Sequence, residues 1–557
     1  MADFRKAVLA HLSRGVEAGL ARQNAATGRF QEKDGGFAWT NQDVQLALAA
    51  LYVTKDDANP WFGNPRLLDA VSRAGDAIRD GQNAEGMIEF IKVDGSRWGW
   101  SLMPWPLYHW LETYALVRDH LTPERRARWE EGLTLAYGNV ARQISDGQLR
   151  LHNIEAWLAM GTSRLGHLLG RPDWIDAGAR YLRQLVAHQH PEGYWPEGQG
   201  PTTSYNRVYV HALGLQYAFF RDDALLPALE RALDFQLHFT YPDGRNVETI
   251  DGRVRYHDTV SAQGWPGFIH FPKGRALVRL MMDALARHKP EGGLEPHVTS
   301  TLLTWRDADE AAIPQTSPRF AGNFHGRALV RRHGPWFICL SGYTMTDEAF
   351  AASFRQRWHL DRQNYLSIWH ERAGLIIGGG NSKYHPDFST FSMVQGRARL
   401  TQADSAQLEQ TADEDTGVFH YGPVRGIVAV RVLDDTRVQI TLRAEGGPCE
   451  HLCGLMSVRV KGGTVMAGSQ EEQVTLDPKA VWGAARPEDE NSGALSVRSP
   501  KWTLHLPPGG WFRWPIYPFN PYAMDGVAPP SEAAASASVP LKPGQARSFI
   551  LEAPTAG

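Results

Sequence analysis

Residues 1 to about 300 place hydrophobic positions at the spacing of amphipathic helices, with short polar turns between them. Residues 122–124 combine an N-cap, a proline at the first helical position and an acidic first turn ahead of one such stretch. Asn153 opens a second stretch that ends at Gly170, and Asp173 caps a third. Further helical stretches are predicted at about 3–25, 41–54, 65–81, 105–120, 203–221, 223–240 and 272–288.

The predicted helices come in pairs joined by short turns, at a loose period of about 50 residues. Helical hairpins of this kind bury their faces against neighbouring hairpins, as an open solenoid or as a closed ring. Three longer connectors, 83–104, 190–202 and 241–271, are rich in glycine and aromatic residues, and loops of that length are usually functional. We therefore expect residues 1–310 to form an α/α toroid, an incomplete barrel of helical hairpins, with a cleft at one end.

The pattern changes near residue 310, where short alternating or β-branched runs replace the helical period. Runs of this length and spacing predict an antiparallel β-sandwich over residues 323–557 that contributes to the cleft, after a linker at 311–322. The Ala- and Ser-rich segment 529–540 is predicted to be a low-complexity surface loop. The fold class is thus α+β multidomain, with an N-terminal toroid and a C-terminal sandwich.

Composition narrows the range of functions. The 557 residues carry 58 basic and 61 acidic side chains, a net charge of -3, so no basic field exists to attract nucleic acid. Three cysteines exclude a disulfide scaffold, and no apolar run approaches the ~20 residues of a membrane span. The N-terminus lacks the apolar core of a signal peptide, which predicts a cytoplasmic protein, or a periplasmic or secreted one if a signal was removed. The oligomeric state is left open.

Tryptophan is the first positive indication of a ligand. Several of the 19 tryptophans stand beside glycine or proline, including Trp98, Trp100 and Trp195. Flat indoles on loops form platforms for sugar rings, and packing in a core is the alternative for each of them.

Two groups of polar residues in the helical part are candidates for chemistry. Tyr205 and Tyr209 are four residues apart, on one face of a helix whose N-terminal potential eases tyrosine ionisation. His152 and Asn153 stand about one helical hairpin upstream, so both groups could lie at the same rim. The alternatives are that the tyrosines pack under the next helix and that Asn153 is simply an N-cap.

A third group lies across the predicted domain boundary. His359, Asp361 and Gln363 alternate and could project from one face of a strand, and Asn364 follows them. Arg245 belongs to a polar loop whose cationic groups suit a carboxylate ligand. The alternative for the group at 359–364 is ion pairing at a sheet edge. The alternative for the Arg245 loop is that it is simply solvated. The Cys-Glu-His-Leu-Cys run at 449–453 lacks a usual zinc spacing and a fourth ligand, so no metal is predicted there.

Together these features resemble the polysaccharide lyases that join an α/α toroid to an antiparallel β-sandwich, particularly the heparinase II/III-like and alginate-lyase group. Three stretches carry the resemblance: PEGYWPEGQGPTTSYNRVY at 191–209, LHNIEAW at 151–157 and RWHLDRQNYLSIW at 357–369. The His-Gly-His lead-in familiar from that group is Arg-Trp-His at 357–359 here, and we expect neither a metal nor another cofactor in the chemistry.

The resemblance implies β-elimination on a uronic-acid-containing, anionic polysaccharide or oligosaccharide, which leaves a 4,5-unsaturated uronate end. His152 and Asn153 would neutralise the uronate, and Tyr205, or Tyr209 at the next turn, would act as base and acid. His359 would be the opposing base for the other C5 epimer or a sugar-binding residue. The residues expected to bind substrate are Trp98, Trp100, Trp195, Glu197, Arg207, Arg245, Gln363 and Asn364.

Two other classes of protein remain open at this point. A glycoside hydrolase on the same toroid needs a carboxylate pair, and the connectors supply Glu192, Glu197, Asp243 and Asp251. A non-catalytic carbohydrate-binding protein would bind through the aromatic loops without turnover. The sequence does not disclose the polymer, the C5 epimer, or endo against exo action.

Overall fold

The computed structural model divides into two compact units. Unit 1 comprises Met1–Trp195, Tyr205–Asp234 and Thr259–Ala311, and unit 2 comprises Pro196–Ser204, Phe235–Asp258 and Ala312–Gly557. The structure describes residues 3–30, 40–91, 97–197, 200–256, 258–345, 356–378, 380–383, 385–395, 398–447, 450–460, 464–467, 472–489, 495–521, 523 and 525–554.

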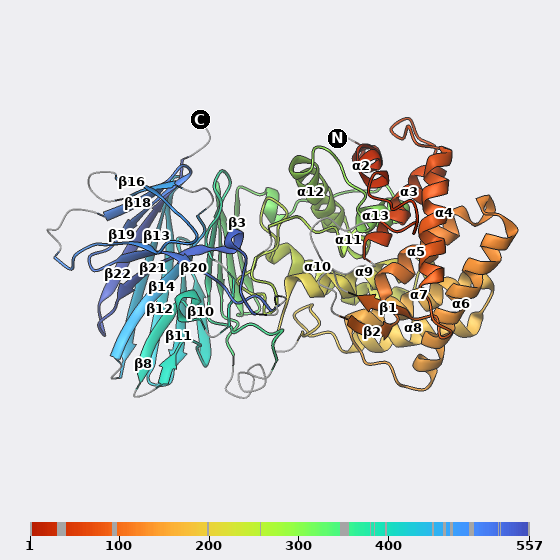
Figure 1. Cartoon of the computed structure of the whole chain (residues 1–557). Coiled ribbons are helices and arrows are strands. Elements are labelled where there is room, and N and C mark those ends of the chain that lie inside the picture. Colours follow the sequence, from red (N-terminus) through yellow and green to blue (C-terminus); the bar gives the residue numbers. More distant parts are fainter. Residues whose placement is uncertain are drawn as a thin grey trace. The chain divides into compact units, whose positions relative to one another are not determined.

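Helices make up most of unit 1 (Figure 1). Many begin at a proline, whose fixed φ suits the first helical position and whose missing N–H would have no partner there. In α6 the Thr122 Oγ1 also accepts a hydrogen bond from the Arg125 N at 3.3 Å, as the sequence predicts. The helices are α1 (Phe4–Arg14), α2 (Val16–Leu20), α3 (Val44–Val53), α4 (Pro65–Asp80), α5 (Pro104–Val117), α6 (Pro123–Ser145), α7 (Asn153–Leu169), α8 (Pro172–Ala187), α9 (Thr203–Phe220), α10 (Leu226–His238), α11 (Trp265–Phe268), α12 (Pro272–His288) and α13 (Pro296–Thr304).

The inner helices of unit 1 form a ring. In turn, α3 contacts α5, α5 contacts α7, α11 contacts α13, and α13 returns to α3. The Trp157 Nε1 of α7 donates to the Val208 O of α9 at 2.9 Å, and Gly214 of α9 lies directly against Gly267 of α11. Inner helices such as α3 are buried on nearly all sides, whereas the outer α4 and α8 bury one stripe, as amphipathic surface helices do. This is the predicted α/α toroid.

Two antiparallel sheets make up most of unit 2. Within the described residues, one sheet has the order β10-β11-β12-β13-β22-β19-β18-β15-β16, and the other has the order β17-β20-β21-β14-β7-β6-β5-β4-β3, with β8 and β9 joined at β14. The strands are β3 (Arg319–Phe324), β4 (Ala328–His333), β5 (Trp336–Ser341), β6 (Leu366–His370), β7 (Gly374–Ile377), β8 (Phe391–Gln395), β9 (Ala398–Leu400), β10 (Ser405–Gln410), β11 (Glu414–Tyr421), β12 (Val424–Asp434), β13 (Arg437–Gly446), β14 (Glu450–Val458), β15 (Thr464–Ala467), β16 (Glu472–Thr475), β17 (Trp482–Ala485), β18 (Leu495–Ser499), β19 (Trp502–Leu506), β20 (Trp511–Ile516), β21 (Ala534–Pro540) and β22 (Ala546–Glu552).

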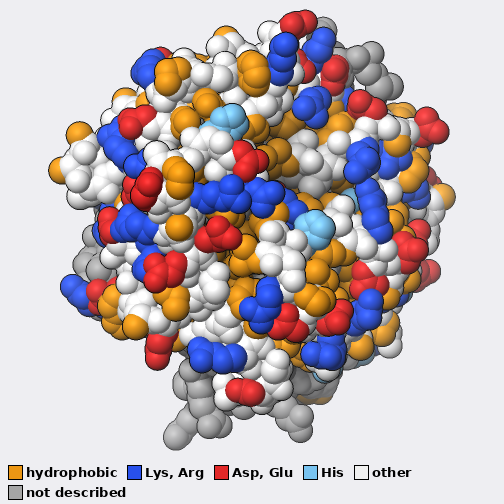
Figure 2. Space-filling model, turned by 90° about the vertical axis from the view of Figure 1, so that its right-hand side faces the viewer, with side chains coloured by type: hydrophobic (Ala, Val, Ile, Leu, Met, Phe, Trp, Pro, Cys, Tyr) orange, Lys and Arg blue, Asp and Glu red, His pale blue; other side chains and the backbone are white. Residues whose placement is uncertain are grey.

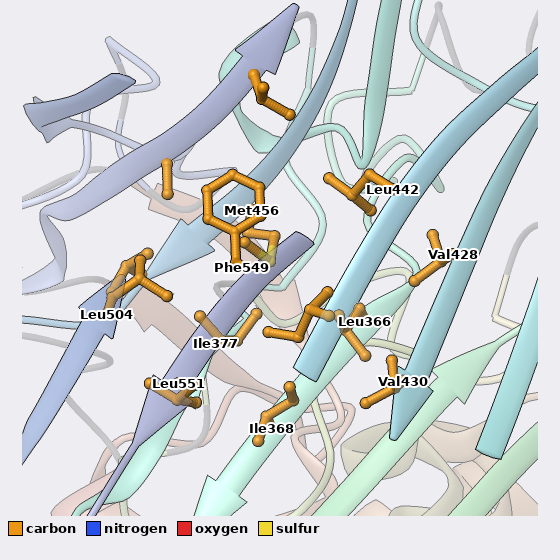
Figure 3. Close-up of a cluster of buried hydrophobic side chains, with 14 of the residues drawn as sticks. Leu366, Ile368, Ile377, Val428, Val430, Leu442, Met456, Leu504, Phe549 and Leu551 are labelled. Atoms are coloured by element: carbon orange, nitrogen blue, oxygen red, sulfur yellow. The ribbon is translucent and has the colours of Figure 1, made fainter. Parts of the chain in front are cut away.

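The core of unit 2 is the layer of side chains between these sheets (Figure 3). Strands such as β11 alternate buried and partly exposed positions, so each contributes every second residue. Ile368 and Ile377 enter the layer from one sheet, and Val430 and Leu551 enter it from the other. The predicted antiparallel β-sandwich is therefore present.

Several details differ from the prediction. The predicted 311–322 linker contains the first residues of β3, and unit 2 also takes in 196–204 and 235–258. The connector 83–104 contains a hairpin of β1 (Ile88–Ile91) and β2 (Arg97–Ser101). Instead of a surface loop, 529–540 contains β21, which lies between β20 and β14 with most residues buried. Its Ala and Ser side chains are small enough to pack between neighbouring strands, which composition alone does not reveal.

Charges of both signs are interspersed on the face drawn in Figure 2, with hydrophobic side chains between them. In the part of the chain that the structure describes, no helix is long and apolar enough to cross a membrane.

Candidate functional site

The candidate residues of unit 1 gather where α7 and α9 begin. His152, with φ −146° and ψ 166°, is the N-cap of α7, and Asn153 is its first helical residue. The interpretation of Asn153 as the N-cap is therefore wrong, and its side chain is 2% exposed. Tyr181 holds this turn, since its hydroxyl accepts from the His152 N at 3.3 Å and donates to the Arg150 O at 2.6 Å. Burial raises the pKa of Tyr181, which keeps this hydroxyl a donor.

The prediction that Asp173 caps the next helix is also wrong, because α8 begins at Pro172 with Arg171 as its cap. At the start of α7, His152 also has an anionic neighbour. Its Nδ1 lies 3.5 Å from the Glu155 Oε2.

The His152 ring meets the tyrosine helix α9. Its centroid lies 6.5 Å from that of Tyr209, with the rings steeply inclined at 70°. This approach of the two rings is consistent with the prediction that the His152–Asn153 pair and the tyrosines of α9 lie together. Tyr209 is buried, with the Trp195 indole stacked on it at 5.1 Å, whereas Tyr205 is only partly buried.

Two residues expected to bind substrate lie in the interior of unit 1. Trp195 stacks on Tyr209, as above, and its Nε1 donates to the Leu185 O at 2.9 Å. Arg207 is 1% exposed and its Nη1 donates to the Ser261 O at 2.8 Å, while burial lowers the pKa of Arg207 to about 9. Neither side chain presents a surface to a sugar in this structure, because the packing of α9 against its neighbours encloses both.

The hairpin β1–β2 carries the remaining aromatic candidates. Trp100 is 51% exposed, so its indole is accessible to a ligand. Arg97, on the same strand, forms an ion pair with Glu89 across the hairpin. The side chain of Trp98 lies outside the described residues.

The candidate residues of unit 2 gather around His359. Burial lowers the pKa of His359, and the positive charges of Arg253 and Lys383 lower it further, so its imidazole is neutral at neutral pH. Glu197 is nearly buried and its Oε2 accepts from the Arg253 Nη1 at 2.9 Å. Lys383, which no sequence motif singles out, donates from its Nζ to the His359 O at 3.0 Å and to the Gln356 O at 2.8 Å.

His359 does not lie on a strand as predicted. Residues 359–364 form a loop before β6 that is buried from Leu360 onward, with one isolated bridge between Asp361 and Ser382. Gln363 is fully buried and its Nε2 donates to the His385 O at 3.0 Å. The Asn364 Nδ2 donates to the Gly380 O at 3.3 Å. Both amides hold the loop itself, so either side chain would have to give up its hydrogen bond in order to bind a substrate.

Arg245 is also engaged within unit 2. Its Nε donates to the Asp243 Oδ2 at 2.9 Å, and the same oxygen accepts from the Trp369 Nε1 at 2.8 Å. Arg245 lines a small cavity of about 10 Å³, with room for about one water molecule. For Arg245 to bind a carboxylate ligand, as predicted, its hydrogen bonds to Asp243 would have to break.

Three of the four carboxylates proposed for hydrolysis are already engaged by other groups of the protein. Asp243 holds Arg245, and Glu197 holds Arg253. Asp251 is fully buried and accepts hydrogen bonds at both oxygens from backbone N–H groups. A general acid or base must reach a substrate, so none of these three is placed to act as one.

Potential metal ligands do not cluster in the described ranges. No group of three or more His, Cys, Asp or Glu side chains there is arranged to hold a metal ion. Cys449 lies outside the described residues, and the expectation that the chemistry uses no metal stays a prediction.

No protein-family model matches the chain, and no curated protein matches it. Its fold is similar to that of heparinase III, with a TM-score of 0.52 and 11% identity over 94% of this chain and 78% of that one. A heparinase III with methylated lysines gives a TM-score of 0.53 at 11% identity, covering 92% and 77%. The chondroitin AC lyase of Streptomyces coelicolor gives 0.49 at 11%, covering 100% and 80%. The two heparinase III structures show that this chain has the fold of the heparinase III-like polysaccharide lyases.

Proposed function

We propose that this protein is a polysaccharide lyase that cleaves a uronic-acid-containing, anionic polysaccharide or oligosaccharide by β-elimination. The observation that carries the proposal is the meeting of α7 and α9 in the toroid, where the His152 ring lies 6.5 Å from that of Tyr209. In β-elimination a histidine or an amide can stabilise the charge on the uronate, and a tyrosine can serve as base and acid. The fold shared with heparinase III supports the proposal.

The reaction begins with removal of the C5 proton, which places negative charge on the uronate carboxyl group. His152 would stabilise that charge, together with the N–H groups at the start of α7, whose partial positive potential favours an anion. Asn153, which is 2% exposed, would have to become accessible to contribute. The Tyr205 phenolate would take the C5 proton as the C4=C5 double bond forms and the C4–O bond breaks. The resulting phenol would then return a proton to the departing oxygen, so protons and charge balance.

Tyr205 is the better candidate for this step than Tyr209. Tyr209 is 2% exposed under Trp195, whereas Tyr205, one turn earlier on α9, retains an accessible part. The role of His359 is assigned separately: as a half-buried, neutral imidazole it would accept a proton from the other C5 epimer or a hydrogen bond from a sugar hydroxyl.

A hydrolase is less well supported. Hydrolysis needs two carboxyl groups that reach the scissile bond. Asp243, Glu197 and Asp251 are each held by an arginine or by backbone N–H groups. A purely sugar-binding role remains as an outcome of the experiment below.

The test is ultraviolet absorbance during incubation with a panel of uronate polysaccharides, with and without a chelator. Elimination creates a conjugated double bond, which hydrolysis cannot produce. We expect absorbance to rise with the wild-type protein and Tyr205→Phe to lower the rate at least about 100-fold, the scale of a lost general acid–base group. Tyr217→Phe is the matched control, because it removes a phenolic hydroxyl from the same helix α9 without this loss.

The other outcomes are distinct. Loss of activity in Tyr209→Phe alone would keep the reaction class and move the acid–base role to Tyr209. Reducing ends without absorbance would identify a hydrolase, and binding without either signal would identify a carbohydrate-binding protein.

A further inference from the structure

The start of α9 is capped by a residue far along the chain. The first two residues of this helix, Thr203 and Ser204, belong to unit 2. The Asp251 Oδ2 accepts hydrogen bonds from the Thr203 N at 2.8 Å, the Thr203 Oγ1 at 2.9 Å and the Ser204 N at 3.4 Å. A carboxylate in this position satisfies N–H groups that no helical carbonyl can reach and favours the positive end of the helix dipole.

The local sequence offers its own cap and does not use it. Thr202 directly precedes the helix, and threonine is a common N-cap residue. Its Oγ1 is buried and, in the described part of the chain, has no hydrogen-bond partner. The capping role therefore falls to Asp251.

The second oxygen of Asp251 organises its own turn. The Oδ1 accepts from the Arg253 N and from the Val254 N, each at 2.8 Å. The contacts of both oxygens described above are with N–H or O–H donors, so the fully buried carboxylate is solvated by protein groups in place of water.

A second clamp holds the same two stretches of chain together. The Arg362 Nη1 donates to the Ile250 O at 2.7 Å, and its Nη2 donates to the Pro201 O at 2.8 Å. A Cβ on Gly252 would lie 2.9 Å from that Nη2, so a side chain there would displace the guanidinium. On the other side, the Asn381 Nδ2 donates to the Asp251 O at 3.0 Å.

We infer that Asp251 is a positioning residue that fixes the first turn of α9 and thereby the direction in which Tyr205 leaves the helix. Tyr205 is the third residue of α9, so it moves with that turn. This inference rests on the proposed function for its catalytic consequence. An error of about 1 Å in the placement of an acid–base group can cost about 100-fold in rate.

Asp251→Asn is the sharpest variant, because it keeps size and shape. Asparagine has one acceptor oxygen and one NH2 group. In either orientation the NH2 group faces N–H donors, those of Thr203 and Ser204 or those of Arg253 and Val254. The substitution therefore breaks one side of the cap in either case.

The experiment combines hydrogen exchange with kinetics on the full chain. We expect the amides of the first turn of α9 to exchange at least about tenfold faster in Asp251→Asn, because loss of a cap lowers the free energy needed to open that turn. Exchange at the start of α7 should stay unchanged. On an active polymer, kcat should fall at least about tenfold while KM stays within about twofold, as expected when orientation and not binding is lost.

Two further variants control the result. Asp3→Ala removes the cap of α1, where the Asp3 Oδ1 accepts from the Arg5 N at 3.0 Å, and should alter neither α9 exchange nor kcat. Thr203→Val removes the side-chain bond to Asp251, keeps the backbone bond to it and should raise α9 exchange less than Asp251→Asn does. If Asp251→Asn does not fold, Thr203→Val alone decides the question.

Unchanged exchange in the first turn of α9 would overturn the inference, and so would faster exchange with unchanged kcat. If the wild-type protein releases no unsaturated product from any polymer, the proposed function fails. The exchange measurement then still decides whether Asp251 fixes the first turn.

Discussion

Glu248 makes the stability of unit 2 depend on pH. The side chain is 1% exposed, its Oε2 accepts from the Tyr241 hydroxyl at 3.0 Å, and it lines the cavity of about 10 Å³. With so little water available, burial raises the pKa of Glu248 from 4.5 to about 7. The folded state therefore holds a proton that the unfolded chain releases at lower pH.

The magnitude follows from that difference. A rise of about 2.5 in pKa corresponds to about 3 kcal/mol. Because the folded pKa lies above the unfolded one, this stability is fully present below pH 4.5 and is lost as the pH rises through about 7. Glu248→Gln keeps the size and an acceptor oxygen and cannot ionise. We expect the variant to gain up to about 3 kcal/mol on the wild type between pH 4.5 and pH 8.

The assay is calorimetric melting of wild type and Glu248→Gln across that pH range. Unit 2 has about 280 residues, so about 3 kcal/mol corresponds to a relative shift of about 5 °C in Tm. Glu409→Gln is the control, at an exposed position of β10 in the same unit. Its curve of Tm against pH should be parallel to that of the wild type. Parallel Tm curves for Glu248→Gln and the wild type would refute the reasoning, because they would mean that Glu248 titrates alike in the folded and unfolded states.

Two further predictions concern unit 1. Gly214→Ala should lower the free energy of unfolding by at least about 2 kcal/mol, because its Cβ would lie 2.2 Å from the Gly267 N; chemical denaturation tests this against Gly138→Ala, where the nearest atom lies at 3.4 Å. Burial lowers the pKa of His270 from 6.5 to about 4, so the stability it contributes is present above pH 6.5 and is lost as the pH falls towards 4. The Tm of His270→Asn should therefore fall less than that of the wild type between pH 7 and pH 4, and an equal fall would contradict this.

The helices of unit 1 were largely predictable because their start signals are local. The proline at the first position of α6, with Thr122 before it, determines that boundary whatever the rest of the chain does. The strand β21 was not predictable in the same way. Its Ala- and Ser-rich sequence is compatible with a loop, and only pairing with β14 and β20 makes it a buried strand.

The residues of the candidate site show the same contrast between local sequence signals and contacts with distant segments. The spacing of His152 and Tyr209 in the sequence predicted their approach, since one helical hairpin separates them. Trp195 stands in a Gly- and Pro-rich stretch that looks exposed, yet it is buried, because Tyr209 and Leu185 supply partners that no local pattern specifies.

By itself, the sequence determined the order of the two folds, the positions of most helices and the residue types at the start of α7 and α9. These follow from local periodicity, capping and turn chemistry. Only the tertiary structure decided which polar side chains are accessible and which are used internally. Asp251 could have been a catalytic carboxylate, but it caps α9 from 48 residues away. Such a contact depends on how distant segments pack, and it cannot be predicted from the spacing of residues in the sequence.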